Sequence, residues 1–548
     1  MQIYGDASSE MSVADFAAEV SSRVGDLEGL QSLRAILIAC GQLEQLVLEA
    51  NQATSDLRDS AQRATDHAAA AFYTVWSREN VRAPRPNWQI GRELQDLRAQ
   101  LARLTLAEGA VGRLNLPEGF AFYALYPEQY CAAAVAYWGR HGPGQGCTHV
   151  LGLRSIGTTL SAAVAVVLRA GNAIHRRYSV RPYGQPFQRQ IELTKPIAGD
   201  ERVLVVDEGP GLSGSSFFAA YSALNALGVA ARRQVYFCAH PHPPGKMASR
   251  TIHTFWQQAE RFVASNHDSS ISTAGGLCST IRYELSRHFG TRVLSLEDIS
   301  GGRWRGQAFA ESTSWPAAYA AFERPKLIAR LADGRRVVLK YYGQVLRPDA
   351  VAQQVDWSDR AAARQISSSD SSVATIHGYV ARYWLEGELL SVGDKSDAIL
   401  ERLAKFVASR PWQRLNDERS AARAYYGATG ALGPQEWLRA LDGRVVKLPE
   451  TLAGYDHTAV RSEPLGWDLA AVVVEWQLTV PETEQLLASF RAHSGLSADA
   501  PEISPHIRRY ACFCMAKARF CADQSAGWEA SRLENEAVRY AAYSNGIS

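Results

Sequence analysis

Apolar residues at helical spacing dominate the first hundred positions. The stretch from residue 33 to 50 is rich in strong helix formers and ends in a polar segment. Farther along, spacings of four and three place an apolar stripe on one helix face; its members are Ile90, Leu94, Leu97, Leu101 and Leu104. The stripe is too short for a coiled coil, so we expect a helix docked on its own domain. Residues 1–110 are predicted to form a helical N-terminal region.

Short apolar runs that alternate with helical stretches follow residue 110. Strands are expected at 148–153, 202–206 and 233–239, and helices at 159–170 and 215–228. Strands separated by helices of this length form parallel sheets with right-handed crossovers. The fold class is therefore α/β, with a parallel-sheet domain at 111–294 whose ligand is expected at the carboxyl ends of the strands.

A third region is predicted from residue 295 to 548. Residues 326–343 have the pattern of two strands joined by a turn at Asp333 and Gly334. The remainder mixes strand fragments with helices such as 468–478. We expect an α+β domain here, and we find no internal repeat.

Charge and composition narrow the classes of partner. The chain has 548 residues, with 58 Lys plus Arg against 56 Asp plus Glu and a net charge of +2. With charges so nearly balanced, we do not expect the chain to coat nucleic acid or an anionic membrane by general electrostatic attraction. No secretory leader and no run of about 18 apolar residues is found, so we expect a cytoplasmic protein without a membrane partner. A protein partner or homo-oligomer stays open.

The cysteines do not encode a known framework. The 8 cysteines are scattered and never form a CxxC pair, so neither a disulfide framework nor a zinc ribbon is predicted. Cys512, Cys514 and Cys521 lie close together in a helical pattern, where packing in a small core explains them better than a metal does.

The sequence VLVVDEGPGLSGSS at 203–216 carries the clearest chemistry. Its glycines satisfy the GxGxxG pattern of dinucleotide folds, but no acid follows at the distance needed to hold a ribose. A P-loop is excluded because no Lys precedes the serines. Backbone N–H groups of the small-residue loop, which opens a helix, suit a single phosphate. Asp207 and Glu208 suit a ribose diol, directly or through Mg²⁺.

This pattern resembles the PRPP-binding loop of type I phosphoribosyltransferases. It departs in one respect, because four residues rather than the usual three separate the acidic pair from the Ser-Gly. The flanking segments, HVLGLRSIGTTL at 149–160 and a basic loop at 176–190, are similar to the family, and AHPHPPGKMAS at 239–249 narrows the similarity to the group associated with tellurite resistance.

The resemblance implies roles for individual residues. Asp207 and Glu208 are expected to bind the ribose hydroxyls, and Arg154, Ser155 and Arg181 the pyrophosphate. The phosphate loop is expected to comprise Gly211, Leu212, Ser213, Gly214, Ser215 and Ser216. His240 and His242 follow the third strand, where an acceptor could bind, although a histidine there is more often structural.

The resemblance also implies an activity. The expected enzyme is a phosphoribosyltransferase, a glycosyltransferase that uses Mg²⁺ with PRPP and an unidentified acceptor. Catalysis would rest chiefly on positioning and electrostatic stabilisation. Two alternatives stay open. One is a nucleotide- or PRPP-sensing protein that has lost the activity, and the other is a small-molecule kinase that acts through the C-terminal region.

The C-terminal region weakly resembles aminoglycoside-phosphotransferase-like kinases. Lys340 ends a strand where kinases place the Lys that meets nucleotide phosphates, and Asp456 is the candidate metal-binding Asp. However, no HxD with a downstream Asn occurs, so phosphoryl transfer lacks standard parts. We expect a degenerate kinase-like module that binds a ligand or supports the first domain.

Overall fold

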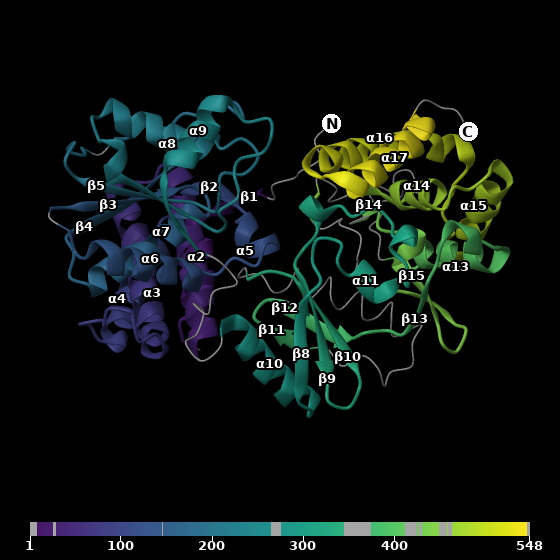
Figure 1. Cartoon of the computed structure of the whole chain (residues 1–548), viewed down its shortest axis with the longest axis horizontal. Helices are drawn as coiled ribbons and strands as arrows, with labels where there is room; N and C mark the ends of the chain where they lie inside the picture. Colours follow the sequence, from purple (N-terminus) through teal and green to yellow (C-terminus); the bar gives the residue numbers. More distant parts are fainter. Residues whose placement is uncertain are drawn as a thin grey trace. The chain divides into compact units, whose positions relative to one another are not determined.

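The computed structural model describes residues 8–25, 29–144, 146–194, 196–264, 276–344, 374–410, 425–426, 430–448, 457–458 and 463–544. The chain forms two compact units. The N-unit comprises residues 6–287 with 343–348, and the C-unit comprises 288–342 and 349–548 with residues 1–5. The three-domain division expected above stays a prediction. Figure 1 labels the elements of each unit.

The N-unit begins with helices and continues as an α/β sheet. Its elements are β1 (Ser8–Ser12), α1 (Val13–Arg23), α2 (Gly29–Glu49), α3 (Ser55–Glu79), α4 (Ile90–Leu104), β2 (Val111–Asn115), α5 (Glu118–Phe122), α6 (Pro127–His141), β3 (Thr148–Leu153), α7 (Gly157–Ala170), β4 (His175–Val180), β5 (Arg202–Val206), α8 (Ser215–Ala226), β6 (Gln234–Cys238), α9 (Arg250–Gln258), β7 (Glu260–Val263) and α10 (Gly276–Phe289).

The apolar stripe expected in the first hundred residues lies in α4. Leu97, Leu101 and Leu104 are fully buried, and α4 packs on α3, which in turn packs on α2. Helix starts follow local chemistry, since the side chain of Thr54 accepts a hydrogen bond from the N–H of Leu57 at the beginning of α3. The stripe thus serves the core of its own unit.

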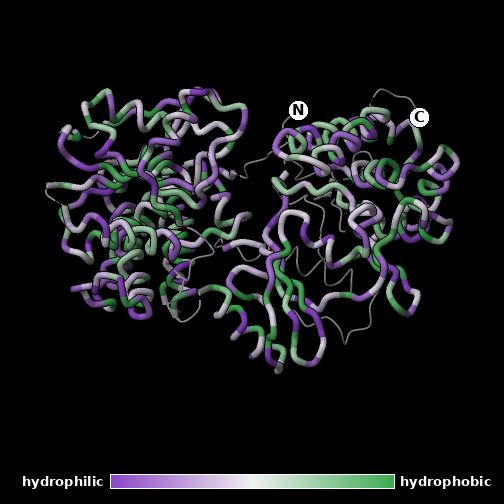
Figure 2. Tube along the Cα trace, in the orientation of Figure 1, coloured by the Kyte–Doolittle hydropathy of each residue, from purple (hydrophilic) through white to green (hydrophobic). Residues whose placement is uncertain are grey.

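A five-stranded parallel sheet forms the centre of the N-unit, in the order β4-β3-β5-β6-β7. Successive residues of β5 point to opposite faces. Leu204 and Val206 pack with the layer that contains α2, α3, α6 and α7, whereas Val203 and Val205 pack with α8 and α9. Both faces are therefore covered, and the expected α/β sheet is present (Figures 1 and 2).

The C-unit combines sheets with a helical layer. Its elements are β8 (Val293–Asp298), α11 (Arg305–Ala308), β9 (Lys326–Leu331), β10 (Arg336–Tyr341), β11 (Ala374–Ile376), β12 (Tyr379–Tyr383), β13 (Gly387–Leu389), α13 (Asp397–Ala408), β14 (Tyr425–Tyr426), β15 (Trp437–Ala440), β16 (Val445–Lys447), β17 (Glu463–Pro464), α14 (Leu465–Glu475), α15 (Val480–Ser494), α16 (Ala500–Gln524) and α17 (Gly527–Ser544).

An antiparallel sheet in the order β11-β12-β10-β9-β8 organises the first half of the C-unit. The hairpin β9–β10 turns at Asp333 and Gly334, as the sequence predicted, and Gly334 has a φ of +88° that favours glycine. Apolar residues of α13 to α16 form a separate core around Trp467 and Trp476. Cys514 is buried in this core and Cys521 in a neighbouring cluster, so both pack as expected.

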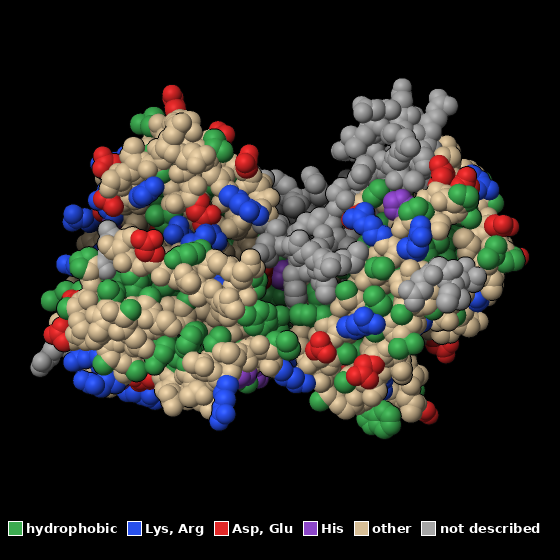
Figure 3. Space-filling model, turned by 90° about the horizontal axis from the view of Figure 1, so that it is seen from above, with side chains coloured by type: hydrophobic (Ala, Val, Ile, Leu, Met, Phe, Trp, Pro, Cys, Tyr) green, Lys and Arg blue, Asp and Glu red, His purple; other side chains and the backbone are tan. Residues whose placement is uncertain are grey.

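The surface shows side chains of both charge signs on the visible face of each unit (Figure 3). Among the described residues, no helix combines the length and apolar character needed to cross a bilayer.

Candidate functional site

A charged pocket lies at the carboxyl ends of β3, β4 and β5 in the N-unit. The chain runs from β3 outward to β4 and then returns to β5 on the other side of β3, so the strand order reverses at this point. Open parallel sheets bind ligands at such a switch point. The pocket has a volume of about 440 Å³ and is lined by Arg113, Asn115, Leu116, Glu118, Arg154, Ser155, Ile156, Arg181, Pro182, Arg189, Asp207, Glu208 and Ser216.

Asp207 and Glu208 follow β5 directly and are half-buried in the pocket. The N–H of Glu208 donates to Oδ1 of Asp207 at 2.9 Å. Burial raises the pKa of Asp207 to about 7, against opposing effects of that N–H and of Arg189. Burial and the neighbouring charge of Asp207 raise the pKa of Glu208 to about 8. The pair is half-buried and lines the cavity with the exposed part of its side chains.

Arginines from two strand ends line the same pocket as the acidic pair. Arg154 follows β3 and its pKa is lowered, chiefly by burial. Arg181 follows β4 and donates from Nε to Oε1 of Glu49 at 2.6 Å, and Nη1 of Arg154 lies 4.0 Å from the same oxygen. Arg189 donates to the carbonyl of Pro182 at 3.3 Å. The pocket therefore brings guanidinium and carboxyl groups together across a few strand ends.

The predicted phosphate loop enters the site only at its end. Gly211 and Gly214 have φ values of +55° and +63°, which their lack of a side chain permits. Ser213 shares a hydrogen bond with Ser215 at 2.8 Å between hydroxyl oxygens. Of the six predicted loop residues, Ser216 lines the charged pocket. Ser215 instead lines an adjoining hollow beside α8, and the other four line neither.

His240 lies beside the loop that carries the acidic pair. A side chain added at Gly209 would meet Nε2 of His240 at 2.7 Å, so Gly209 permits this close approach. Burial, with a smaller effect of His242, lowers the pKa of His240, and the two rings lie 5.3 Å apart. Neither histidine is among the residues that line the charged pocket.

Several residues of the pocket were not selected from the sequence. Arg113 and Asn115 belong to β2, whose alternating burial turns Gly112 and Leu114 inward. The sequence VGRLN gives this strand only a weak signal, because the apolar Val111 is on the exposed face. No sequence signal places β2 beside the ends of strands that come much later in the chain. Glu118 opens α5 and was missed for the same reason.

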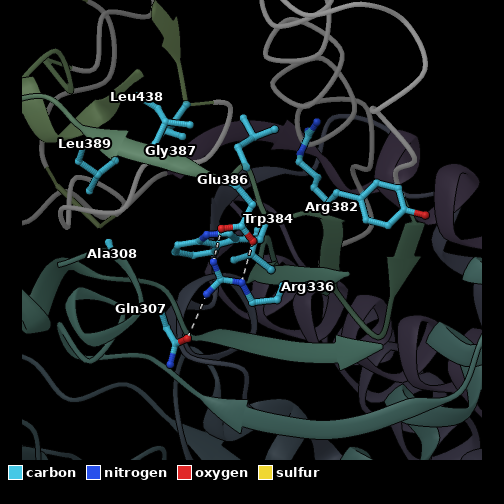
Figure 4. A pocket seen from close by; sticks show the side chains of 13 residues that line it. Gln307, Ala308, Arg336, Arg382, Trp384, Glu386, Gly387, Leu389 and Leu438 are labelled. Carbon is cyan, nitrogen blue, oxygen red and sulfur yellow. Dashed lines mark hydrogen bonds and ion pairs between the residues drawn. The ribbon is translucent and has the colours of Figure 1, made fainter. Parts of the chain in front are cut away.

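A second pocket lies in the C-unit beside β10 and β12 (Figure 4). Its volume is about 110 Å³. Arg336 donates from Nε to Oε1 of Glu386 at 2.9 Å, and its guanidinium lies 5.1 Å from the ring centre of Trp384. Apolar walls come from Val338, Leu389, Leu438 and other residues. The pocket thus offers an aromatic surface and a paired cation.

Lys340 does not line this pocket, although it lies on the same β10 face as Arg336 and Val338. Its side chain is buried. Burial is the main cause that lowers the pKa of Lys447, and the charge of Glu436 opposes it. The charge of Arg410 and then that of Lys340 lower this pKa further. Asp456 lies outside the described residues.

No protein-family model matches the sequence, and no curated protein sequence matches it. Solved structures do show similarity. One is the choline kinase from Streptococcus pneumoniae, at 12% identity and a TM-score of 0.31, covering 49% of this chain and 99% of that one. A type I macrolide 2'-phosphotransferase has 14% identity and a TM-score of 0.28, with 48% and 96% covered.

A further similar structure is the ethanolamine kinase from Plasmodium vivax, at 8% identity and a TM-score of 0.24, covering 39% of this chain and 79% of that one. These proteins are small-molecule phosphotransferases, as expected for the kinase-like region. They contradict the prediction that the enzyme is a phosphoribosyltransferase acting on PRPP. The glycosyltransferase assignment drawn from the 203–216 motif is therefore wrong. The parallel sheet is present, but nothing identifies it as a phosphoribosyltransferase core.

Proposed function

We propose that the N-unit binds a phosphorylated ribose compound, of the class of ribose 5-phosphate or a nucleoside monophosphate, as a sensor rather than as a transferase. One observation carries this proposal: arginines and an acidic pair line a single pocket at the switch point of the parallel sheet. The cavity of about 440 Å³ falls within the roughly 300–1,000 Å³ of typical small-molecule sites.

The charges divide the pocket into two parts. Arg154 and Arg181 offer guanidinium donors to phosphate oxygens, and the beginning of α8 at Ser216 adds backbone donors and a favourable dipole. Asp207 and Glu208 accept hydrogen bonds from vicinal hydroxyls. A ligand with an anion and a diol satisfies both parts, whereas inorganic phosphate satisfies one.

Mg²⁺ suits this pocket as a partner of the ligand. Carboxylate oxygens are the donors it prefers, and it usually retains several waters. Asp207 and Glu208 would hold it through water, and it would neutralise phosphate charge. Because the pKa values of both acids are raised, the carboxylates ionise fully only at alkaline pH. We therefore expect Mg²⁺ to bind there best at alkaline pH.

Calorimetry with ribose 5-phosphate tests the proposal. At pH 9, where both acids are ionised, Asp207→Asn with Glu208→Gln is expected to weaken ribose 5-phosphate binding at least about tenfold, since two charge-assisted hydrogen bonds are lost. The affinity of this variant for inorganic phosphate should not fall, because the lost carboxylates only repel that anion. Arg154→Gln should weaken both ligands. If the acid variant binds ribose 5-phosphate as tightly as the wild type does, the proposed diol site is wrong.

A second candidate function is small-molecule phosphoryl transfer through the C-unit. The aromatic and apolar walls around Trp384 favour a planar base in that pocket (Figure 4). Glu386 is the single carboxylate among the residues that line it, and it is paired with Arg336. The pocket itself can therefore hold the base but supplies no second carboxylate for a metal.

ATP titration with Mg²⁺ tests this second candidate. Trp384→Ala should abolish ATP binding because it removes the aromatic wall. The control is Trp528→Ala, at a tryptophan that is 84% exposed, and it should bind ATP as the wild type does. ATP binding that survives Trp384→Ala would exclude this pocket as the nucleotide site.

A further inference from the structure

Three metal-ligating side chains meet at the amino end of the parallel sheet, at the opposite strand ends from the charged pocket. Cys147 directly precedes β3, His149 lies within it, and Glu201 directly precedes β5. The strands β3 and β5 are parallel neighbours, with Thr148 opposite Arg202. Parallel pairing at this register therefore holds the three side chains together.

The distances suit one small cation. One ligand atom from each residue lies within 4.8 Å of those from the other two, and Nε2 of His149 lies 2.9 Å from Oε2 of Glu201. Ligands of a tetrahedral zinc ion, at about 2.0–2.3 Å from the metal, are roughly 3.3–3.8 Å apart. Small side-chain rotations thus suffice to surround an ion.

Two polar atoms at this place have no hydrogen-bond partner in the part of the chain that the structure describes. They are Nδ1 of His149, whose residue is 1% exposed, and the buried phenol oxygen of Tyr178. The rings of Tyr178 and His149 lie edge to face, with their centroids 6.0 Å apart. Unpartnered buried polar atoms are costly, and a hydrated metal ion supplies what the phenol lacks.

Glu201 is already oriented. Its Oε2 accepts a hydrogen bond from the N–H of Ala198 at 2.8 Å. This bond holds the carboxylate toward His149, whose Nε2 lies 2.9 Å from the same oxygen. Such backbone support is typical of groups that position metal ligands.

The donor set selects a class of metal. A thiol, an imidazole and a carboxylate suit Zn²⁺, whereas Mg²⁺ and Ca²⁺ prefer oxygen ligands alone. A bound metal would displace the thiol proton, so binding releases one proton to solvent.

We propose that Cys147, His149 and Glu201 form a mononuclear Zn²⁺ site. Water takes the fourth position and accepts a hydrogen bond from the phenol of Tyr178. The ion joins the amino ends of β3 and β5 and stabilises the N-unit. This site is independent of the ribose-phosphate pocket.

Cobalt(II) titration of the metal-free full chain tests the site. The wild type is expected to bind one equivalent and to develop a thiolate-to-cobalt charge-transfer band. Cys147→Ser should lose the band, and Glu201→Gln should weaken binding at least about tenfold. The control Cys278→Ser, at an exposed cysteine, should match the wild type.

A stability measurement provides a second readout. Zn²⁺ should raise the unfolding temperature of the wild type and of Cys278→Ser, but not that of Cys147→Ser. The proposal is overturned if the wild type gives no charge-transfer band at saturating cobalt, or if the band survives Cys147→Ser.

Discussion

Asp207 and Glu208 are adjacent acids that share one pocket, and each retains a proton into the neutral range. Burial is the main cause for both, and the charge of Asp207 adds to it for Glu208. The unfolded chain loses these protons near pH 4. Between about pH 4 and pH 8 the folded state therefore binds more protons than the unfolded state, and this pair lowers stability as pH rises.

The Asp207→Asn and Glu208→Gln double variant should reveal this effect. We expect it to gain stability over the wild type as pH rises from 4.5 to 9, up to about 1.4 kcal/mol for each pKa unit removed. Urea unfolding at several pH values measures the difference. Glu192→Gln, at an exposed acid of the same unit, serves as the control. A difference that does not change with pH would contradict the raised pKa values.

At the scale of elements, β4 shows how tertiary pairing changes a local pattern. The basic segment at 176–190 is expected from the sequence to be a loop, but Arg176 and Arg177 belong to β4. Nη2 of Arg177 lies 2.9 Å from Oε2 of Glu44, and its Nε lies 2.6 Å from Oδ1 of Asp66. Those acids come from α2 and α3, so no local pattern could reveal the pairing.

Arg177→Met should destabilise the N-unit strongly. It leaves the buried Glu44 without its cation, which costs roughly 3–5 kcal/mol. Arg176→Met, at an exposed position of the same strand, should change the free energy of unfolding by about 0.5 kcal/mol or less. Denaturant unfolding compares the two variants, and equal effects would show that the Arg177 pairing contributes little.

At the scale of the whole molecule, the apolar pattern predicted more than the motif did. Runs such as Val203 to Val206 are buried on both faces, so they identified the parallel sheet and the strand end that carries Asp207. The motif at 203–216 describes one strand-to-helix turn, and a turn does not specify an enzyme class. Arg113 and Glu118 join the pocket through tertiary packing, which the sequence does not display.

The position of Glu49 affects which anions the arginines of the charged pocket select. Its carboxylate lies against Arg181 and near Arg154, so these cations carry an internal counterion before any ligand arrives. A monovalent anion such as chloride gains little by competing with it. A dianion that contacts both guanidinium groups offers more charge than Glu49 does. The pocket should therefore bind a phosphate dianion in preference to the monovalent anions of a cell.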